Sequence, residues 1–185
     1  MRIISGKLKG KIFSIPKNLS KIRPTTDRAK ESLFNILNNK IIFNNKLVVD
    51  LFCGIGSISY EFVSRGISKI YSLDINAMCI QYIRKKSIDF NIQNKILALK
   101  YNVFFFLKKN RNLNSDIIFA DPPYGMEDKY FLLLINLCFN NELIKKNGLL
   151  IIEHPVNKQI FCDNKNYINT KKYGRICFSF FTKKN

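Results

Sequence analysis

The feature of this sequence that most constrains its fold is a regular alternation of short apolar runs with helix-like segments. Between residues 47 and 152, each apolar run is followed by a segment whose apolar residues recur every three or four positions. Short apolar runs are typical of strands buried on both faces of a parallel sheet, so the pattern predicts an α/β fold with helices on both faces. We expect strands at 47–51, 69–73, 96–99, 116–120 and 148–152, and helices at 57–65, 77–90, 104–109 and 129–139.

The start of the chain departs from this alternation. Residues 2–5 and 11–15 predict two short strands, each next to a glycine, which together would form a hairpin. A helix is predicted over 27–38, with Thr25 or Thr26 as its capping residue. We therefore expect a small extension, made of a β-hairpin and a helix, ahead of the alternating core.

The end of the chain also departs from it. Residues 167–172 and 175–182 predict two strands joined by a tight turn, so the sheet should end in an antiparallel pair. The expected sheet then has seven strands, most of them parallel. The length favours one domain over 1–185, divided into an N-terminal extension at 1–40 and a Rossmann-like core at 41–185.

The chain is strongly basic, with a formal net charge of +18, which points to a polyanionic partner such as a nucleic acid. Lysines outnumber arginines 24 to 7, a bias that an A/T-rich genome could also produce. The charge is uneven, however: residues 1–46 carry +9, residues 47–150 carry +4, and residues 151–185 carry +5. This distribution favours a nucleic-acid-facing N-terminal region over a general compositional drift.

Several other classes are disfavoured by composition. The five cysteines form no Cys-x-x-Cys pair and the chain has one histidine, so we expect neither a metal site nor a disulfide framework. Scattered cysteines fit the reducing cytoplasm. No run approaches 18 apolar residues and the start lacks a secretory signal, so we expect a cytoplasmic protein that is not in a membrane. We also expect a monomer.

The first candidate site is the segment 48–56, Val-Val-Asp-Leu-Phe-Cys-Gly-Ile-Gly. An apolar strand ends there in Asp50, and two glycines then allow a sharp turn close to a ligand. A dinucleotide site would require a third glycine where Ser59 stands, which disfavours pyrophosphate binding. Asp50 instead suits a ligand with an ammonium group, such as methionine. A purely structural turn is the alternative for this loop alone.

The second candidate is Asp74, which follows the strand at 69–73 and lies 18 residues after Gly56. An acid near that separation can accept hydrogen bonds from two ribose hydroxyls. The alternative is an acid at the start of the next helix, ahead of Asn76. Asn102 follows the third strand, where contact with an adenine and capping of a helix are equally good interpretations.

The most specific signal is Asp121-Pro122-Pro123-Tyr124, directly after the fourth strand. An amino group attached to a base ring is a weak nucleophile because its lone pair is delocalised into the ring. Asp121 and the Pro122 carbonyl can accept its hydrogens, which localises the lone pair, and consecutive prolines fix the direction of that carbonyl. Tyr124 can stack on the base. The motif therefore predicts methylation of an exocyclic nitrogen, with the methyl group taken from a sulfonium, and the alternative is a plain turn.

Three neighbouring features carry less weight. Glu153 ends the fifth strand and is either a site residue or a surface acid. His154 precedes a proline and is expected to be structural. The aromatic run at 104–106 is expected to lie in the core rather than to stack on bases.

The ends of the chain carry a family resemblance. Arg2-Ile-Ile-Ser-Gly, Gly10 and 23–35, with the sequence Arg-Pro-Thr-Thr-Asp-Arg at its start, are similar to the RsmD family of bacterial 16S rRNA guanine-N2 methyltransferases. Further matches are Asp50-x-Phe52-x-Gly54-x-Gly56, Glu61, Ser64-Arg65-Gly66, Asp121-Pro-Pro, Glu153 and Tyr173-Gly174. The Arg-Pro-Thr-Thr-Asp-Arg segment is the specific part, because Asp-Pro-Pro-Tyr also occurs in DNA adenine methyltransferases.

The resemblance implies a class I methyltransferase fold and S-adenosylmethionine as cofactor. It implies that the 2-amino group of guanine 966 is methylated in 16S rRNA of the small ribosomal subunit or an assembly intermediate. The cofactor would be bound by Asp50, Phe52, Gly54, Gly56, Asp74 and Asn102. The guanine would be held by Asp121, Pro122 and Tyr124, and substrate contacts are assigned to Arg23, Thr25, Asp27 and Arg28.

Three rival interpretations remain at the level of sequence. A DNA adenine or cytosine amino-methyltransferase is disfavoured because 185 residues leave little room for a separate target-recognition domain. A non-catalytic RNA-binding module is disfavoured by the intact Asp50 loop, Asp74 and Asp121 motif. A nicotinamide oxidoreductase is disfavoured by Ser59 together with the Asp121-Pro-Pro-Tyr motif.

Overall fold

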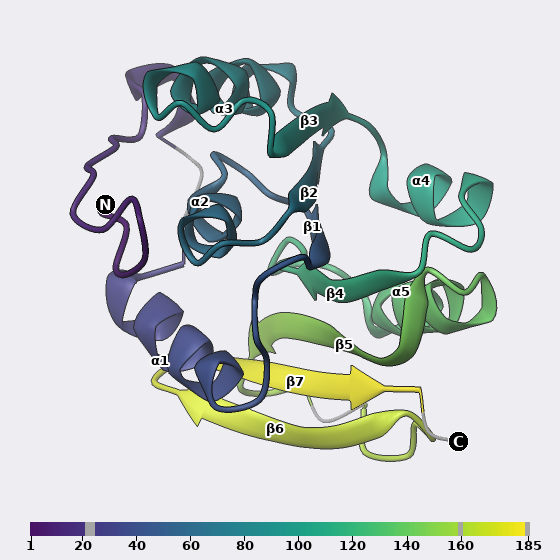
Figure 1. Ribbon diagram of the computed structural model, residues 1–185. Coiled ribbons are helices and arrows are strands. Elements are labelled where there is room, and N and C mark those ends of the chain that lie inside the picture. Colours follow the sequence, from purple (N-terminus) through teal and green to yellow (C-terminus); the bar gives the residue numbers. More distant parts are fainter. Residues whose placement is uncertain (21–24, 159–160, 184–185) are drawn as a thin grey trace.

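The computed structural model describes residues 1–20, 25–158 and 161–183, and its centre is one seven-stranded sheet (Figure 1). The strand order is β3-β2-β1-β4-β5-β7-β6. The first five strands are mutually parallel, and β7 pairs antiparallel with both β5 and β6. The predicted mostly parallel sheet with an antiparallel C-terminal end is confirmed.

The strands lie close to their predicted positions. One prediction was short: the fifth strand was expected at 148–152, yet it begins at Ile144 because its first residues pair beside Ser115 through a bulge. Asn147 in this stretch has a positive φ of 62°, which a polar loop-like sequence tolerates. The strands are β1 (Leu47–Leu51), β2 (Lys69–Asp74), β3 (Ile96–Lys100), β4 (Ser115–Ala120), β5 (Ile144–Pro155), β6 (Tyr167–Tyr173) and β7 (Ile176–Thr182).

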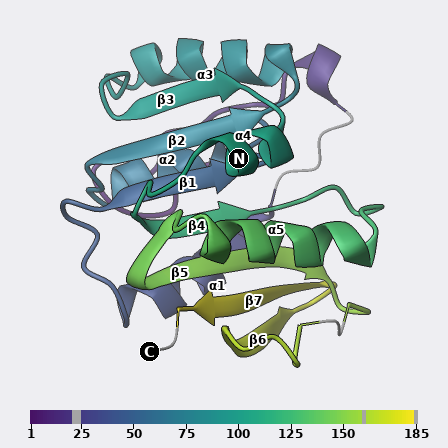
Figure 2. The ribbon, with the colours of Figure 1, turned by 90° about the vertical axis from the view of Figure 1, so that its right-hand side faces the viewer.

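The helices cover both faces of the sheet, as Figures 1 and 2 show. Helices α1, α2 and α3 lie on one face, and α4 and α5 lie on the other. Each face buries its own apolar cluster, and the N-terminal residues Ile3 and Phe13 belong to the cluster on the α2 side. The helices are α1 (Asp27–Asn38), α2 (Ser57–Ser64), α3 (Ala77–Asp89), α4 (Val103–Lys109) and α5 (Asp128–Asn140), with a short 3-10 helix η1 at Lys17–Leu19.

Side-chain caps explain where three helices begin. Thr26, one of the two predicted candidates, accepts a hydrogen bond from the Ala29 backbone N–H at the start of α1. Asn76 caps α3 and Asn102 caps α4 in the same way. Each cap supplies an acceptor for an N–H that the helix itself leaves unpaired. Within the described residues, no helix combines the length and apolar composition needed to cross a bilayer.

The predicted N-terminal hairpin is present only in reduced form. Arg2 and Ile12 form one isolated antiparallel bridge, and neither 2–5 nor 11–15 is a regular strand. The reason is that several backbone N–H groups in this segment bond to helix α2 instead of to a partner strand. Ile4 donates to Glu61 at 2.8 Å, Lys7 to the Ser64 carbonyl at 2.8 Å, and Leu8 to the Ser64 hydroxyl at 3.0 Å.

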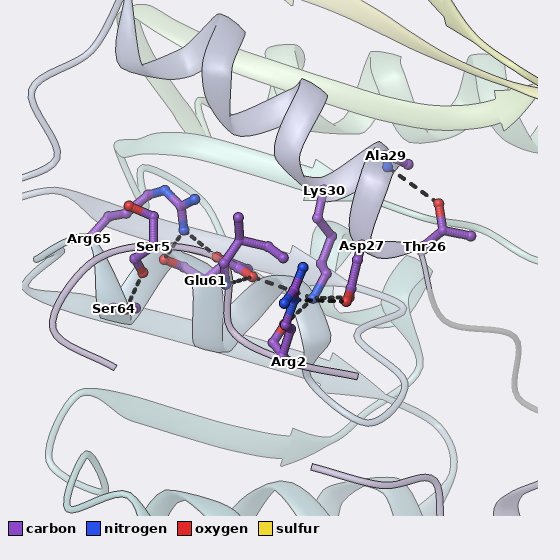
Figure 3. Close-up of polar contacts among 10 residues, drawn as sticks. Arg2, Ser5, Thr26, Asp27, Ala29, Lys30, Glu61, Ser64 and Arg65 are labelled. Carbon is purple, nitrogen blue, oxygen red and sulfur yellow. Dashed lines mark hydrogen bonds and ion pairs between the residues drawn. The ribbon is translucent and has the colours of Figure 1, made fainter. Parts of the chain in front are cut away.

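A set of charged side chains, two of them fully buried, joins this segment to helices α1 and α2 (Figure 3). Lys30 and Glu61 are both fully buried, and their charged atoms lie 3.4 Å apart. Lys30 also pairs with Asp27 at 3.2 Å and donates to the Arg2 carbonyl at 2.8 Å. Arg65 pairs with Glu61 from the next turn of α2. We call Asp27, Lys30, Glu61 and Arg65 the N-terminal clamp.

The strand order determines where a ligand can bind. The chain moves outward from β1 through β2 to β3, then crosses back to β4 on the other side of β1. The connections after β1 and β4 therefore diverge, and parallel sheets bind ligands in the crevice that this divergence opens at the carboxyl ends of the strands.

Candidate active site

A cavity of about 500 Å³ lies at the carboxyl ends of β1, β2 and β4. We call it the strand-end cavity. It lies within the size range of small-molecule and cofactor sites. Five of its lining residues were predicted to bind cofactor, namely Asp50, Phe52, Gly54, Asp74 and Asn102. Three more were predicted to hold the base, namely Asp121, Pro122 and Tyr124.

Asp50 is a buried acid at the end of β1, with 1% of its surface exposed. The Ser59 hydroxyl donates to its carboxylate at 2.5 Å, and the Ser59 and Ser72 hydroxyls are 2.7 Å apart. Burial raises the pKa of Asp50 to about 7, opposed by the Ser59 hydrogen bond and reinforced by the charge of Asp74. Ser59, which at the sequence level only weakened the dinucleotide interpretation, thus orients the acid of this site.

The loop after β1 contains three residues with left-handed backbone conformations. Phe52, Gly54 and Gly56 have positive φ angles of 62°, 52° and 83°. A Cβ on Gly56 would lie 2.9 Å from the Ile83 side chain, so a larger residue would have to shift that side chain and would be strained at this φ. Gly56 itself does not line the strand-end cavity, but it sets the turn between Ile55 and Ser57, which do.

Asp74 joins this loop to the next strand. One carboxylate oxygen accepts from the Gly54 N–H at 2.9 Å, and the other accepts from the Asn76 N–H at 2.8 Å. A carboxylate oxygen has a second lone pair, so each can accept one more hydrogen bond from a ligand in the cavity. Asp74 therefore orders the loop and still presents acceptors to the cavity.

Asn102 caps α4 with its side-chain oxygen, as one of its two interpretations predicted, and the residue also lines the cavity.

The far side of the cavity is apolar. Ile75 and Phe104 line it too, and neither was predicted. The run 104–106 does not lie wholly in the core as expected: Phe106 is buried, Phe104 faces the cavity, and Phe105 is 69% exposed. The available sequence signal for this apolar wall was the isoleucine that directly follows Asp74.

Asp121 directly follows β4, whose neighbouring strand β1 carries Asp50, and both acids line the strand-end cavity. Burial raises the pKa of the Asp121 carboxyl well above its usual range, and the charges of Glu153 and Asp50 raise it further. Tyr124 lines the same cavity and is 49% exposed. The motif therefore combines a half-buried acceptor with a half-exposed tyrosine in the lining of the cavity.

Glu153 is not a surface acid, because only 4% of it is exposed. The Thr25 hydroxyl donates to its carboxylate at 2.9 Å, across 128 positions of sequence. Thr25 lines the strand-end cavity and also a second cavity of about 450 Å³, as does Tyr124. We call this second space the side cavity. Its wall includes Arg28, Glu153 and the β6–β7 turn.

One other predicted substrate residue, Asp27, lies outside both cavities. Asp27 belongs to the N-terminal clamp, where it pairs with Lys30 and with Arg2, and it lines neither cavity (Figure 3). The prediction for Arg23 falls outside the described residues.

Two cysteines near the site and the histidine lie in surroundings that do not favour a catalytic role. Cys53 and Cys79 line the strand-end cavity, and burial raises the pKa of Cys53 well above its usual range and that of Cys79 to about 12. Both thiols therefore stay protonated near neutral pH and are poor nucleophiles. His154 lies 2.7 Å from the Ser179 hydroxyl and contacts Phe161. Within 1–20, 25–158 and 161–183, no group of three or more His, Cys, Asp or Glu could hold a metal ion.

Solved structures with the same architecture include several that are named as methyltransferases. "Putative methyltransferase yhhF" from Escherichia coli superposes with a TM-score of 0.84 at 24% identity, covering 98% of this chain and 97% of that one. A putative RNA methyltransferase from Pyrococcus horikoshii superposes with a TM-score of 0.68 at 19% identity, covering 94% and 92%. At these identities the likeness establishes the class I methyltransferase fold.

Sequence comparisons establish the family. Residues 1–182 match the family described as "Conserved hypothetical protein 95". "Ribosomal RNA small subunit methyltransferase D" of Buchnera aphidicola, from Acyrthosiphon pisum, is 38% identical over 172 residues, or 92% of this chain and 85% of that one. The protein of the same name from Escherichia coli K12 is 28% identical over 158 residues, covering 84% and 75%. Both the whole-length family match and the close relative lead to one conclusion: this chain belongs to the RsmD family.

Proposed function

We propose that this protein transfers a methyl group from S-adenosylmethionine to the 2-amino group of guanine 966 in 16S rRNA of the small ribosomal subunit. The observation that carries the proposal is the meeting of Asp50, Asp74 and the Asp121 motif around one cavity. Relatives that bear the name "Ribosomal RNA small subunit methyltransferase D" support rRNA as the substrate. Such a protein would act in the cytoplasm, where small subunits are assembled.

The residues of the strand-end cavity fit this cofactor. Asp50 is a buried acid that forms no ion pair within the described residues, so it suits the ammonium group of a methionine moiety. The free lone pairs of Asp74 suit two ribose hydroxyls. Ile75 and Phe104 offer an apolar wall to a base. When bound, the cofactor would supply a methyl group on a positively charged sulfur.

The Asp121 motif would prepare the acceptor nitrogen. Asp121 and the Pro122 carbonyl accept hydrogen bonds from the amino group, which localises its lone pair toward the methyl carbon. As the nitrogen–carbon bond forms and the sulfur–carbon bond breaks, the nitrogen becomes acidic and must lose a proton. The raised pKa of Asp121 makes its carboxylate a stronger base for that proton. Tyr124 stacks on the ring and holds it in position.

The decisive experiment offers the protein two substrates with the methyl group of S-adenosylmethionine radiolabelled. Small-subunit particles from cells lacking the modification should become labelled in 16S rRNA, and duplex DNA should not. Preferential labelling of DNA would favour a DNA amino-methyltransferase. Absence of cofactor binding in calorimetry would favour the non-catalytic RNA-binding module.

A further inference from the structure

The side cavity is lined by basic side chains that have no role in the proposed methyl transfer. It lies where the start of α1 approaches the turn between β6 and β7, and it shares Thr25 and Tyr124 with the strand-end cavity. A ligand that reaches Asp121 past Tyr124 would therefore continue into the side cavity. Three basic side chains line this space, namely Arg28, Lys172 and Arg175.

The antiparallel end of the sheet brings two of these cations to the active-site edge. Strand β6 ends at Tyr173 and β7 begins at Ile176, so the chain reverses at Gly174 and Arg175. In the pairing of β5 with β7, Pro155 lies opposite Ile176. The turn thus lies just beyond the end of β5, where Glu153 enters the site. Gly174 has a φ of 61°, which a glycine adopts without strain in so tight a turn.

The three cations are available to a ligand. Within the described residues, Arg28, Lys172 and Arg175 form no ion pair and no side-chain hydrogen bond with the protein. The acid that lines the same space, Glu153, is buried and accepts a hydrogen bond from Thr25. The outer wall of the side cavity is therefore positively charged, while its inner end next to Asp121 is acidic.

This arrangement matches one ligand chemistry. A nucleotide that enters base-first would place its neutral ring against Tyr124 and the acids, and its phosphates against the outer cations. A protein that reads single-stranded nucleic acid commonly combines an aromatic platform with a basic groove in this way. We infer that the side cavity binds the sugar–phosphate backbone on either side of the target nucleotide, through Arg28, Lys172 and Arg175. The inference rests on the proposed function for the identity of the polymer as RNA.

The test measures binding, so that it does not depend on catalysis. A fluorescently labelled single-stranded RNA of mixed sequence is titrated with the wild type and with the double variant Lys172→Ala/Arg175→Ala. The matched control is Lys108→Ala/Lys109→Ala, which removes two exposed lysines from the end of α4, outside both cavities. Thermal melting of all three proteins checks that they are equally folded.

We expect the side-cavity variant to raise the Kd for RNA at least tenfold, and the control to change it less than twofold. Each phosphate contact on a single strand contributes about 0.7 to the slope of log Kd against log salt, so the slope should fall by between about 1 and 2. The Kd for S-adenosylmethionine should stay unchanged. Arg28→Ala, on a separate element, should weaken RNA binding as well.

Equal weakening by the two double variants would overturn the inference, because general charge would then suffice. Unchanged RNA affinity in the side-cavity variant would also overturn it and would leave an acidic protein as the ligand for this surface. The outcome is separable from that of the proposed function. A wild type that fails to methylate particles, yet loses RNA affinity only in the side-cavity variant, would refute the function and retain the binding site.

Discussion

The N-terminal clamp and the strand-end cavity both bury acids, but they treat those acids in opposite ways. In the clamp, Glu61 is fully buried and pairs with Lys30 and Arg65, so its charge is neutralised inside the protein. In the cavity, Asp50 is equally buried, yet its partner is the uncharged Ser59 hydroxyl. Burial raises the pKa of Asp50 to about 7, although the Ser59 hydrogen bond opposes the rise.

The difference separates structure from function. A buried charge that the protein itself neutralises can hold two elements together, as the clamp holds the N-terminal segment on α1 and α2. Buried acids without a cation cost stability and are expected where a ligand supplies the missing charge. The strand-end cavity has two acids, Asp50 and Asp121, that form no ion pair within 1–20, 25–158 and 161–183, and burial raises the pKa of both. We interpret them as acceptors for a cationic cofactor and an amino group.

The largest expected effect is on catalysis. Asp121→Ala should reduce the rate of methyl transfer by about a thousandfold or more, a loss comparable to removal of a transition-state hydrogen-bond partner. Affinity for S-adenosylmethionine, measured by calorimetry, should stay within about threefold of the wild type. Asp121→Asn keeps an oxygen acceptor but cannot take a proton, so its rate of methyl transfer should lie between those of the wild type and Asp121→Ala. A near-normal rate for the alanine variant would refute the role of Asp121.

A substitution in the N-terminal clamp should lower the stability of the protein rather than its catalytic rate. Lys30→Ala would leave Glu61 buried with Arg65 as its remaining cation, which should lower the free energy of unfolding by about 3 to 5 kcal/mol. Denaturant unfolding measures this loss. Lys183→Ala, which removes an exposed pair with Glu142, is the control and should have a much smaller effect. If Lys30→Ala unfolds like the wild type, the clamp does not hold the segment.

The smallest effect is a pH dependence of cofactor binding. Below pH 7 the Asp50 carboxyl takes up a proton and becomes neutral, so it no longer attracts an ammonium group. Affinity for S-adenosylmethionine should therefore fall about tenfold between pH 8 and pH 6. Ser59→Ala removes the hydrogen bond that lowers this pKa, so the fall should begin at a higher pH.

Asp50→Asn provides the matched control for this dependence. The variant should bind the cofactor more weakly at every pH, and the affinity should lose its dependence between pH 6 and pH 8. A dependence that persists in Asp50→Asn would assign the titration to another group.

The alternating part of the fold could be predicted because its signals are local. Each buried strand is one apolar run, and each helix carries its own periodicity and, at Asn76 and Asn102, its own cap. The N-terminal hairpin could not be predicted correctly because Glu61 and Ser64, more than fifty residues away, accept its hydrogen bonds. The early start of β5 was missed because a bulge absorbs a polar, loop-like stretch.

The candidate site also contains residues that the sequence predicts and residues that it does not. Asp50, Asp74 and Asp121 each end a strand, so parallel pairing brings them to one edge of the sheet, and sequence reasoning could find them. Phe104 was missed because an aromatic residue gives no local sign of whether it faces a core or a cavity. The bond between Thr25 and Glu153 joins the two ends of the chain and exists only in three dimensions. The division of the chain at residue 40 remains a prediction.

The most direct test of the account is the identity of the methylated base. Unmodified small-subunit particles are incubated with the protein and S-adenosylmethionine, and the 16S rRNA is digested to nucleosides and analysed by mass spectrometry, with the modified position mapped by primer extension. We predict N2-methylguanosine at position 966, formed by the wild type and absent with Asp121→Ala. Methylation of adenine, methylation of a ring nitrogen, or an unmodified guanine 966 would contradict the account.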